Sequence, residues 1–180
     1  MNHSSKFASG IRVTGRSRVE LRDVASLIRK TLRLEKCAKF PVIRFLEYMQ
    51  RTFEGFDFEI VEKVELPKGI YAYYNPIQDC VVIDERFYAL ANQGNGFALW
   101  TILHECAHRI LHRKQMAAFA RQDRTPHKPY EDSEWQANTL VAELMMPPEM
   151  LHDGMTAEEI VEKFGVSPKA AEVRLETYKK

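Results

Sequence analysis

A polar motif inside an apolar segment constrains this chain more than any other feature of its sequence. Residues 104–108 are His-Glu-Cys-Ala-His, and they lie in a segment, Phe97 to Arg113, whose Leu and Ile residues recur at helical spacing. Two histidines four residues apart share one face of a helix, with β-carbons about 5 to 6 Å apart. At that spacing His104 and His108 can bind the same tetrahedral ion. The segment is predicted to be a helix that carries a metal site.

Glu105 adds a general base to the two predicted ligands. A divalent metal lowers the pKa of its bound water toward neutrality, and a carboxylate beside that water takes up the proton. The alternative is a helix with incidental polar residues, but burying two imidazoles and a carboxylate without a partner is costly. The motif therefore predicts metal-assisted hydrolysis, with His104 and His108 as ligands and Glu105 as the catalytic residue.

The third ligand has to come from another part of the chain. Lys114 stands six residues after His108, where one class of zinc peptidase has its third histidine. His112 continues the four-residue series, but each such step drifts by about 40° around a helix, so three imidazoles cannot all bind one ion well. We predict that His112 lies behind the ligands or at the surface.

Four carboxylates on or next to the following predicted helix are candidates for the third ligand: Glu131, Asp132, Glu134 and Glu143. We favour Glu134, because it lies in the first turn of a helix whose apolar face can pack on the motif helix. The alternative is a solvated carboxylate that only stabilises the positive helix N-terminus. Two histidines, one glutamate and an open position for water would form a catalytic rather than a structural zinc site.

Three further side chains are candidates for supporting roles. Asn138, four residues after Glu134, is placed to orient a ligating histidine, although an ordinary polar helix residue explains it equally well. Tyr73 and Tyr74 lie on a predicted strand before the motif, where either can supply a hydrogen-bond donor to an oxyanion. Packing in the core or at the surface is the alternative for both tyrosines.

Apolar periodicity divides the rest of the chain into helices and strands. Helices are expected to start near Arg18, Pro41, Ser133, Thr156 and Ser167. The third of these is capped either by Asp132 or by Ser133, with Gln136 completing a capping box. Between Gly55 and Asp84 the period falls to two residues, which predicts three short antiparallel strands.

The length of 180 residues and the apolar fraction of 45% suit one main core. We expect a disordered basic tail over residues 1–17, a main domain over 18–155, and a helix-turn-helix-like pair over 156–180, packed on the domain or appended to it. The three cysteines are widely spaced, and no apolar stretch has the length of a signal peptide or a membrane span. A cytoplasmic protein is therefore expected.

Two charged segments bear on the choice of partner. Residues 1–36 contain nine Lys or Arg against three acids, a balance of +6, which a solvated tail and the polar face of a helix explain without a nucleic acid. Residues 156–180 contain five basic and five acidic residues, a balance of zero, whereas duplex binding relies on phosphate neutralisation. The C-terminal pair is predicted to be structural or to dock a protein, with direct DNA binding as the alternative.

Three blocks of sequence resemble the ImmA/IrrE metallopeptidases of bacteria and mobile elements. The blocks are LWTILHECAHRILH at 99–112, EWQANTLVAELMMP at 134–147 and IVEKFGVSPKAAEVRL at 160–175. The first block suits any peptidase with this zinc motif, whereas the second is much more specific. The resemblance implies a zincin-like α+β fold, in which a small antiparallel sheet packs on a helical core that carries the motif helix, and it makes Glu134 the third zinc ligand.

The resemblance also implies a cofactor and a partner. Members of that family cleave, or trigger loss of, helix-turn-helix repressors that control mobile elements or stress responses, so we expect Zn²⁺ and a repressor protein. The chain departs from the commoner family pattern at Cys106, Leu140 and Val141, none of which is a predicted ligand. Two other classes stay open. One is a DNA-binding or protein-binding regulator whose zinc site senses or stabilises, and the other is a toxin–antitoxin partner without peptidase activity.

Overall fold

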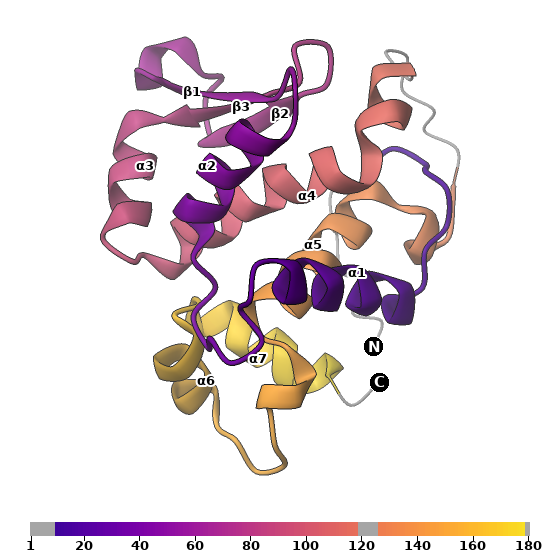
Figure 1. Cartoon of the computed structure of the whole chain (residues 1–180), viewed down its shortest axis with the longest axis vertical. Helices are drawn as coiled ribbons and strands as arrows, with labels where there is room; N and C mark the ends of the chain where they lie inside the picture. The colour runs from indigo at the N-terminus through magenta and orange to yellow at the C-terminus, as the bar shows by residue number, and fades with distance from the viewer. Residues whose placement is uncertain (1–9, 119–125, 179–180) are drawn as a thin grey trace.

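The computed structural model describes residues 10–118 and 126–178, which form seven α-helices and one three-stranded sheet (Figure 1). In chain order the elements are α1 (Arg18–Thr31), α2 (Val42–Thr52), β1 (Asp57–Val61), β2 (Ala72–Asn75), β3 (Cys80–Asp84), α3 (Glu85–Asn92), α4 (Gly96–Ala118), α5 (Ser133–Met145), α6 (Ala157–Phe164) and α7 (Pro168–Thr177). The α+β class is confirmed. None of the described helices is long and apolar enough to cross a membrane.

The sheet is mixed rather than antiparallel. Its order is β1-β3-β2, with β1 parallel to β3 and β2 antiparallel to β3. The predicted direction of the first strand was therefore wrong. A tight connection over residues 76–79 turns β2 back into β3, whereas residues 62–71 carry the chain from β1 to the opposite edge of β3. A two-residue period identifies a strand but fixes neither its neighbour nor its direction.

Helix α4 runs through the middle of the molecule, between the sheet and α5 (Figure 1). Four of its residues around the motif are completely buried: Ile102, Leu103, Cys106 and Ala107. They belong to one core that also includes side chains of α2, α5 and β3. Because this apolar face is fixed in the core, the face that carries His104 and His108 is turned toward α5.

Residues 10–16 lie along the start of α5. The backbone N–H of Val13 donates to the carbonyl of Glu131 at 2.8 Å, and that of Arg16 donates to Tyr130 at 2.9 Å. A side chain at Gly10 would collide with the first turn of α5. Ser17 then caps α1. The predicted disordered tail is therefore wrong for residues 10–17, and residues 1–9 lie outside the described part of the chain.

Asp132 caps the N-terminus of α5. The Oδ1 atom of Asp132 accepts a hydrogen bond of 2.9 Å from the N–H of Trp135. The alternative capping box of Ser133 with Gln136 does not form. The side chain of Gln136 instead turns into the protein, where it is completely buried.

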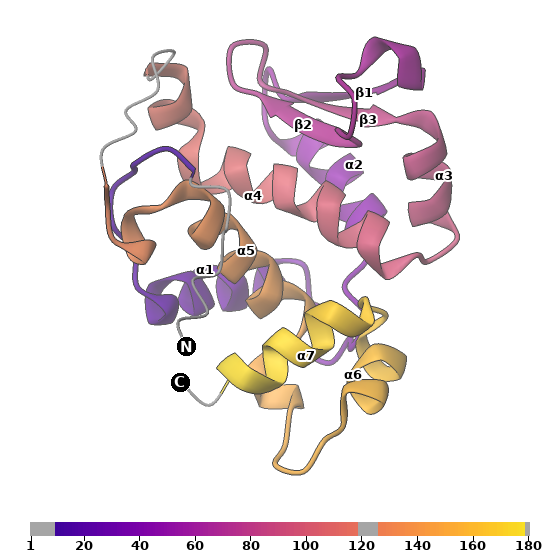
Figure 2. The same ribbon diagram turned by 180° about the vertical axis from the view of Figure 1, so that it is seen from behind.

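Helices α6 and α7 pack on the main core (Figure 2). Gly165 ends α6 in the left-handed conformation, with φ of 68°, and Ser167 caps α7. Phe164 and Ala171 belong to the same core as α4 and α5. The guanidinium of Arg174 on α7 is buried and forms two hydrogen bonds, of 2.8 and 2.9 Å, with the carboxylate of Glu143 on α5. The C-terminal pair is thereby tied to the helix that carries Glu134.

Helix α3 was not expected. Asp84 is both the last residue of β3 and the cap of α3, because its Oδ1 accepts hydrogen bonds from the N–H groups of Arg86 and Phe87. No glycine or proline marks this boundary, so the strand pattern runs directly into the helix.

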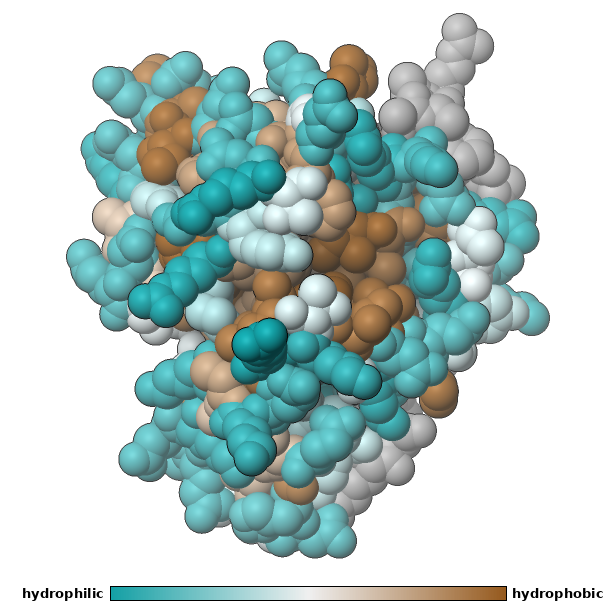
Figure 3. Space-filling view, viewed as in Figure 1, coloured by the Kyte–Doolittle hydropathy of each residue, from teal (hydrophilic) through white to brown (hydrophobic). Residues whose placement is uncertain are grey.

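An apolar hollow of about 200 Å³ lies between α1, α2 and α4, and Figure 3 shows it as a brown area surrounded by hydrophilic side chains. Leu27, Tyr48 and Ile110 are among its lining residues. Ile110 follows His108 by two residues, so the hollow opens on roughly the opposite side of α4 from the histidines.

Candidate metal centre

His104 and His108 on α4 meet Glu134 from the first turn of α5. The two Nε2 atoms lie 2.9 Å apart. Oε2 of Glu134 lies 3.1 Å from Nε2 of His104, and Oε1 lies 3.1 Å from Nε2 of His108. In the described part of the chain, this is the one group of three or more His, Cys, Asp or Glu residues whose ligand atoms converge on a single point.

The three side chains fit a zinc ion in both chemistry and spacing. Tetrahedral zinc bound to imidazole nitrogens at 2.0 to 2.1 Å holds its ligand atoms about 3.3 Å apart, close to the separations of 2.9 and 3.1 Å observed here. The side chains of His104 and His108 are 14% and 5% exposed, whereas that of Glu134 is 36% exposed. The imidazoles are therefore held inside the protein, and the site opens beside the carboxylate, where a fourth ligand can enter.

The electrostatics of the cluster suit a cation. Burial raises the pKa of Glu134, but hydrogen bonds from His104 and His108 outweigh it and hold the pKa below its usual value. Burial lowers the pKa of His104, but the hydrogen bond to Glu134 and the negative charges of Glu105 and Glu134 leave the pKa above its usual value. The site therefore places an ionised carboxylate beside two nitrogen donors.

Glu105 is held in place by a hydrogen bond from the sheet. Its Oε2 accepts a hydrogen bond of 2.8 Å from the backbone N–H of Tyr74 on β2, the strand that packs on α4. Burial raises the pKa of Glu105, and the nearby histidines and the Tyr74 N–H offset only part of this effect. A carboxylate with a raised pKa is the better proton acceptor near neutral pH.

A buried ionic cluster holds Tyr74 in place. The Tyr74 hydroxyl donates to Oδ1 of Asp79 at 2.7 Å, and Arg109 on α4 donates to both oxygens of Asp79 at 3.2 Å. The Arg109 guanidinium also lies over the rings of Phe53 and Phe56. The strand is thus fastened to the motif helix one turn beyond Glu105.

The other three candidate ligands are engaged elsewhere. Glu143 is paired with Arg174, Asp132 caps α5, and Glu131 forms an ion pair of 3.0 Å with an arginine of the N-terminal segment. Among the four carboxylates considered from the sequence, Glu134 is the one that the fold brings to the two histidines. Cys106, inside the motif, faces the core, where burial raises the pKa of its thiol.

His112 lies behind His108, one of the two places expected for it. It is 1% exposed. Its Nδ1 lies 3.3 Å from Nδ1 of His108, and its Nε2 lies 3.0 Å from Oε1 of Gln136. Burial lowers the pKa of His112 to about 4. Gln136 had no place in the site predicted from the sequence, since its proximity to His112 depends on how α4 and α5 pack.

Asn138 lies beside His104, as a residue that orients a ligand would. Its Nδ2 donates to the carbonyl of Glu134 at 2.9 Å, and its Oδ1 accepts from Nε1 of Trp100 at 3.3 Å. A hydrogen bond that Asn138 accepts from the His104 ring is also one of the effects that raise the pKa of His104.

Tyr73 is not brought to the cluster. Successive side chains of a strand point to opposite faces, and on β2 the buried positions are Ala72 and Tyr74. Tyr73 is exposed, and in the described residues its side chain forms no hydrogen bond with the site. The contact that β2 does make, from the backbone of Tyr74 to Glu105, leaves no signal in the sequence, because any residue except proline offers that N–H.

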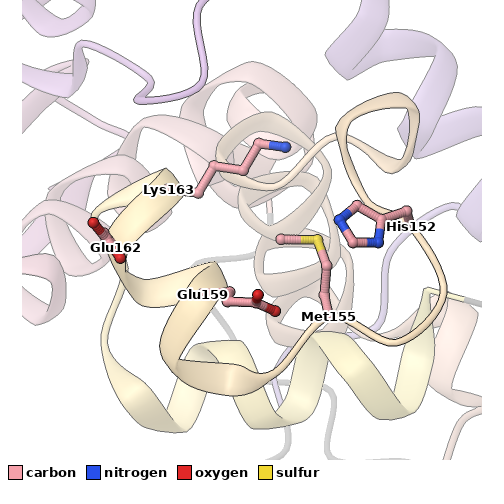
Figure 4. Close-up of a pocket in the computed structure, with 5 residues that line it drawn as sticks. All are labelled: His152, Met155, Glu159, Glu162 and Lys163. Carbon is pink, nitrogen blue, oxygen red and sulfur yellow. The ribbon is translucent and has the colours of Figure 1, made fainter.

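A second surface hollow, of about 460 Å³, lies beside α6 and is lined by His152, Met155, Glu159, Glu162 and Lys163 (Figure 4). Its charged groups are exposed, and Lys163 is engaged by the carbonyl of Met150 at 2.8 Å. None of its residues belongs to the converging group of metal donors. The candidate metal site therefore lies at α4 and α5, away from this hollow.

Comparison with known families agrees with the geometry. The family model of the IrrE N-terminal-like domain, a family named as peptidase M78, matches residues 80–176. That span is more than half of the 180 residues, and it contains both α4 and α5. The chain belongs to the IrrE N-terminal-like family. The resemblance to ImmA/IrrE proteins is thereby confirmed, and the metal donors lie inside the matched span.

Other comparisons bear on the fold alone. A solved structure of a Mycobacterium tuberculosis transcriptional regulator is similar, with a TM-score of 0.63 and 15% sequence identity. The similarity covers 90% of this chain and 48% of that protein, so this chain spans about half its length. No curated protein matches the chain.

Proposed function

We propose that this chain is a zinc-dependent metalloendopeptidase that hydrolyses a peptide bond in a regulatory protein. The convergence of His104, His108 and Glu134, with Glu105 held beside them, is the observation that carries the proposal. Membership of a peptidase family supports it. A structural zinc site would be closed by four protein ligands, whereas this group offers three and opens at Glu134.

Each residue has a distinct role in the proposed reaction. His104, His108 and Glu134 would hold a zinc ion, which would supply Lewis-acid chemistry to a peptide carbonyl and to water. Glu105 takes a proton from the attacking water and passes it to the leaving amine. The N–H of Tyr74 holds one oxygen of Glu105 in place and leaves the other oxygen free for the proton.

The proposed substrate is a helix-turn-helix repressor. Support comes from the resemblance to the ImmA/IrrE metallopeptidases, which implies a partner of that kind. The Glu134 side chain is partly exposed, so a protein chain can approach the site from that side. We therefore propose one regulatory partner rather than general protein digestion.

Cleavage of the repressor encoded nearest to this chain tests the proposal. Zinc-loaded wild type and Glu105→Gln are incubated separately with the repressor, and intact masses are followed. The expected result is two fragments whose masses sum to the repressor plus one water, formed by wild type alone, while Glu105→Gln still binds zinc. Casein serves as the control for general proteolysis and is expected to stay intact. Equal cleavage by Glu105→Gln would rule out the assigned base.

A regulator whose zinc site senses or stabilises is the second candidate. The C-terminal helix pair favours it, since α7 is preceded by a glycine-ended helix and capped by Ser167, as in a helix-turn-helix. The exposed residues of α7 argue against DNA, because Glu172 and Glu176 accompany Lys169 there. A salt-sensitive mobility shift of duplex DNA by the wild-type chain would favour this candidate over the peptidase.

A further inference from the structure

A buried chain of hydrogen bonds runs from the metal ligand His108 to the N-terminal segment. Nδ1 of His108 lies 3.3 Å from Nδ1 of His112, and Nε2 of His112 lies 3.0 Å from Oε1 of Gln136. Nε2 of Gln136 lies 2.9 Å from the carbonyl oxygen of Thr14 and 2.7 Å from that of Tyr130. His108, His112 and Gln136 are all buried. Nε2 of His108, which faces Glu134, takes no part in these hydrogen bonds.

The two carbonyls fix the orientation of the Gln136 amide. A carbonyl oxygen can only accept, so the atom of Gln136 that faces Thr14 and Tyr130 must be the NH₂ group. The amide oxygen is thereby turned to His112. That oxygen also can only accept, so Nε2 of His112 carries a proton and donates it.

The proton positions then follow along the rest of the chain. A neutral imidazole has one N–H, so Nδ1 of His112 is an acceptor. His112 is neutral because its partners are an amide and an imidazole, and burial of an unpaired charge is costly. The proton between the two Nδ1 atoms therefore belongs to His108. This leaves Nε2 of His108 as the nitrogen that is available to a metal.

We propose that His112 and Gln136 are positioning residues, which hold a proton on Nδ1 of His108 and so present its Nε2 to the metal, with the carbonyl of Thr14 as the anchor of the chain. The inference rests on the proposed metal site at His104, His108 and Glu134. Hydrogen bonding of the second ring nitrogen fixes the plane of a ligating imidazole and makes it a stronger donor. Segment 10–16 thus supports the metal site through the carbonyl of Thr14.

Nitrogen-15 NMR of histidine-labelled protein tests the proton positions, with and without zinc. The expected signature is a proton on Nδ1 of His108 and a coupling between the two Nδ1 nuclei across the hydrogen bond. This readout needs neither peptidase activity nor zinc. A proton on Nδ1 of His112 instead, or no coupling between the rings, would overturn the inference even if the protein proves to be a peptidase.

Zinc affinity, measured by competition with a chelator, tests the consequence. His112→Phe and Gln136→Met keep the volume but break the chain, and each is expected to weaken zinc binding about 10- to 100-fold. His112→Gln retains an acceptor for His108 and a donor for Gln136, so it is expected to restore most of the affinity. Leu140→Ala, a core truncation on α5 outside the chain, is the control for general destabilisation.

The controls separate the possible outcomes. If Leu140→Ala, at a temperature where it is folded, loses as much zinc affinity as His112→Phe, the effect is one of stability and the inference is overturned. The same holds if His112→Phe binds zinc as tightly as wild type. If wild type itself binds no zinc, the proposed function fails, whereas the NMR measurement still decides the proton positions.

Discussion

The backbone N–H of Tyr74 donates a hydrogen bond of 2.8 Å to Oε2 of Glu105, which joins the small sheet to the motif helix at the proposed catalytic base. The sheet thereby has a role in the site besides covering the core. Tyr74 is itself held by Asp79 and Arg109, so the position of Glu105 depends on a buried ionic cluster. Substitutions in that cluster are therefore expected to alter the position of Glu105 through β2.

Tyr74→Phe tests this link. Loss of the hydroxyl removes one hydrogen bond to Asp79, while both oxygens of Asp79 keep their hydrogen bonds to Arg109. The free energy of unfolding should therefore fall by about 1 kcal/mol. The rate of peptide cleavage should fall as well, while zinc content stays the same. Urea unfolding and a cleavage assay measure the two effects. Tyr73→Phe, at the exposed neighbour, is the matched control and should change stability by less than about 0.5 kcal/mol. Equal effects of the two variants would contradict the account.

Glu134→Gln should separate the third ligand from the nearby carboxylates. A ligand that binds the folded chain stabilises it by an amount that grows with the logarithm of the affinity, so the melting temperature of wild type should rise on addition of zinc. Glu134→Gln removes an anionic ligand, and its melting temperature should rise much less. Glu131→Gln, three residues earlier and paired with Arg12, should respond as wild type does. A zinc response in Glu134→Gln as large as that of wild type would show that another residue completes the site.

Arg174→Met should loosen the attachment of α7 to α5. Breaking a buried ion pair costs about 3 to 5 kcal/mol, and we expect the lower end because Arg18 and Arg22 also lie within 3.4 Å of the Glu143 carboxylate. Chemical denaturation measures the change. Lys169→Met removes an exposed ion pair from the same helix and should cost less than about 0.5 kcal/mol. If both variants lost the same free energy of unfolding, the buried ion pair would stabilise the fold no more than the exposed one.

The Glu143 carboxylate should also make the stability of the protein depend on pH. Burial raises the pKa of Glu143, but hydrogen bonds from Arg174 and Arg22 outweigh it and hold the pKa below the ordinary 4.5. Its contribution is therefore complete above pH 4.5 and is lost as the pH falls through the lower value of the folded state. The stability difference between wild type and Glu143→Gln should be constant above pH 4.5 and should shrink as the pH falls below that value. Urea titrations at several pH values measure it, and a constant difference would contradict the assignment.

How far the sequence predicts this molecule depends on whether a feature is local. His104, Glu105 and His108 follow from the turn of a single helix. Glu134 is favoured among four carboxylates for its place in the first turn of the next helix, and the family resemblance makes it the third ligand. Tyr74, Gln136 and the anchoring of residues 10–16 depend on tertiary packing, which residue types do not reveal. The parallel pairing of β1 with β3 could not be predicted from the sequence for the same reason. His112 illustrates both cases. Its place behind His108 follows from the four-residue spacing on one helix, whereas its contact with Gln136 depends on how α4 and α5 pack.

X-ray absorption at the zinc edge of the zinc-loaded protein tests the central claim most directly. We expect one zinc per chain, bound by two imidazole nitrogens and by oxygen from Glu134 and solvent, with no sulfur. Glu134→Gln should change the oxygen shell and leave both nitrogens in place. Zinc bound through cysteine sulfur, or a wild-type chain that retains no zinc, would contradict the account.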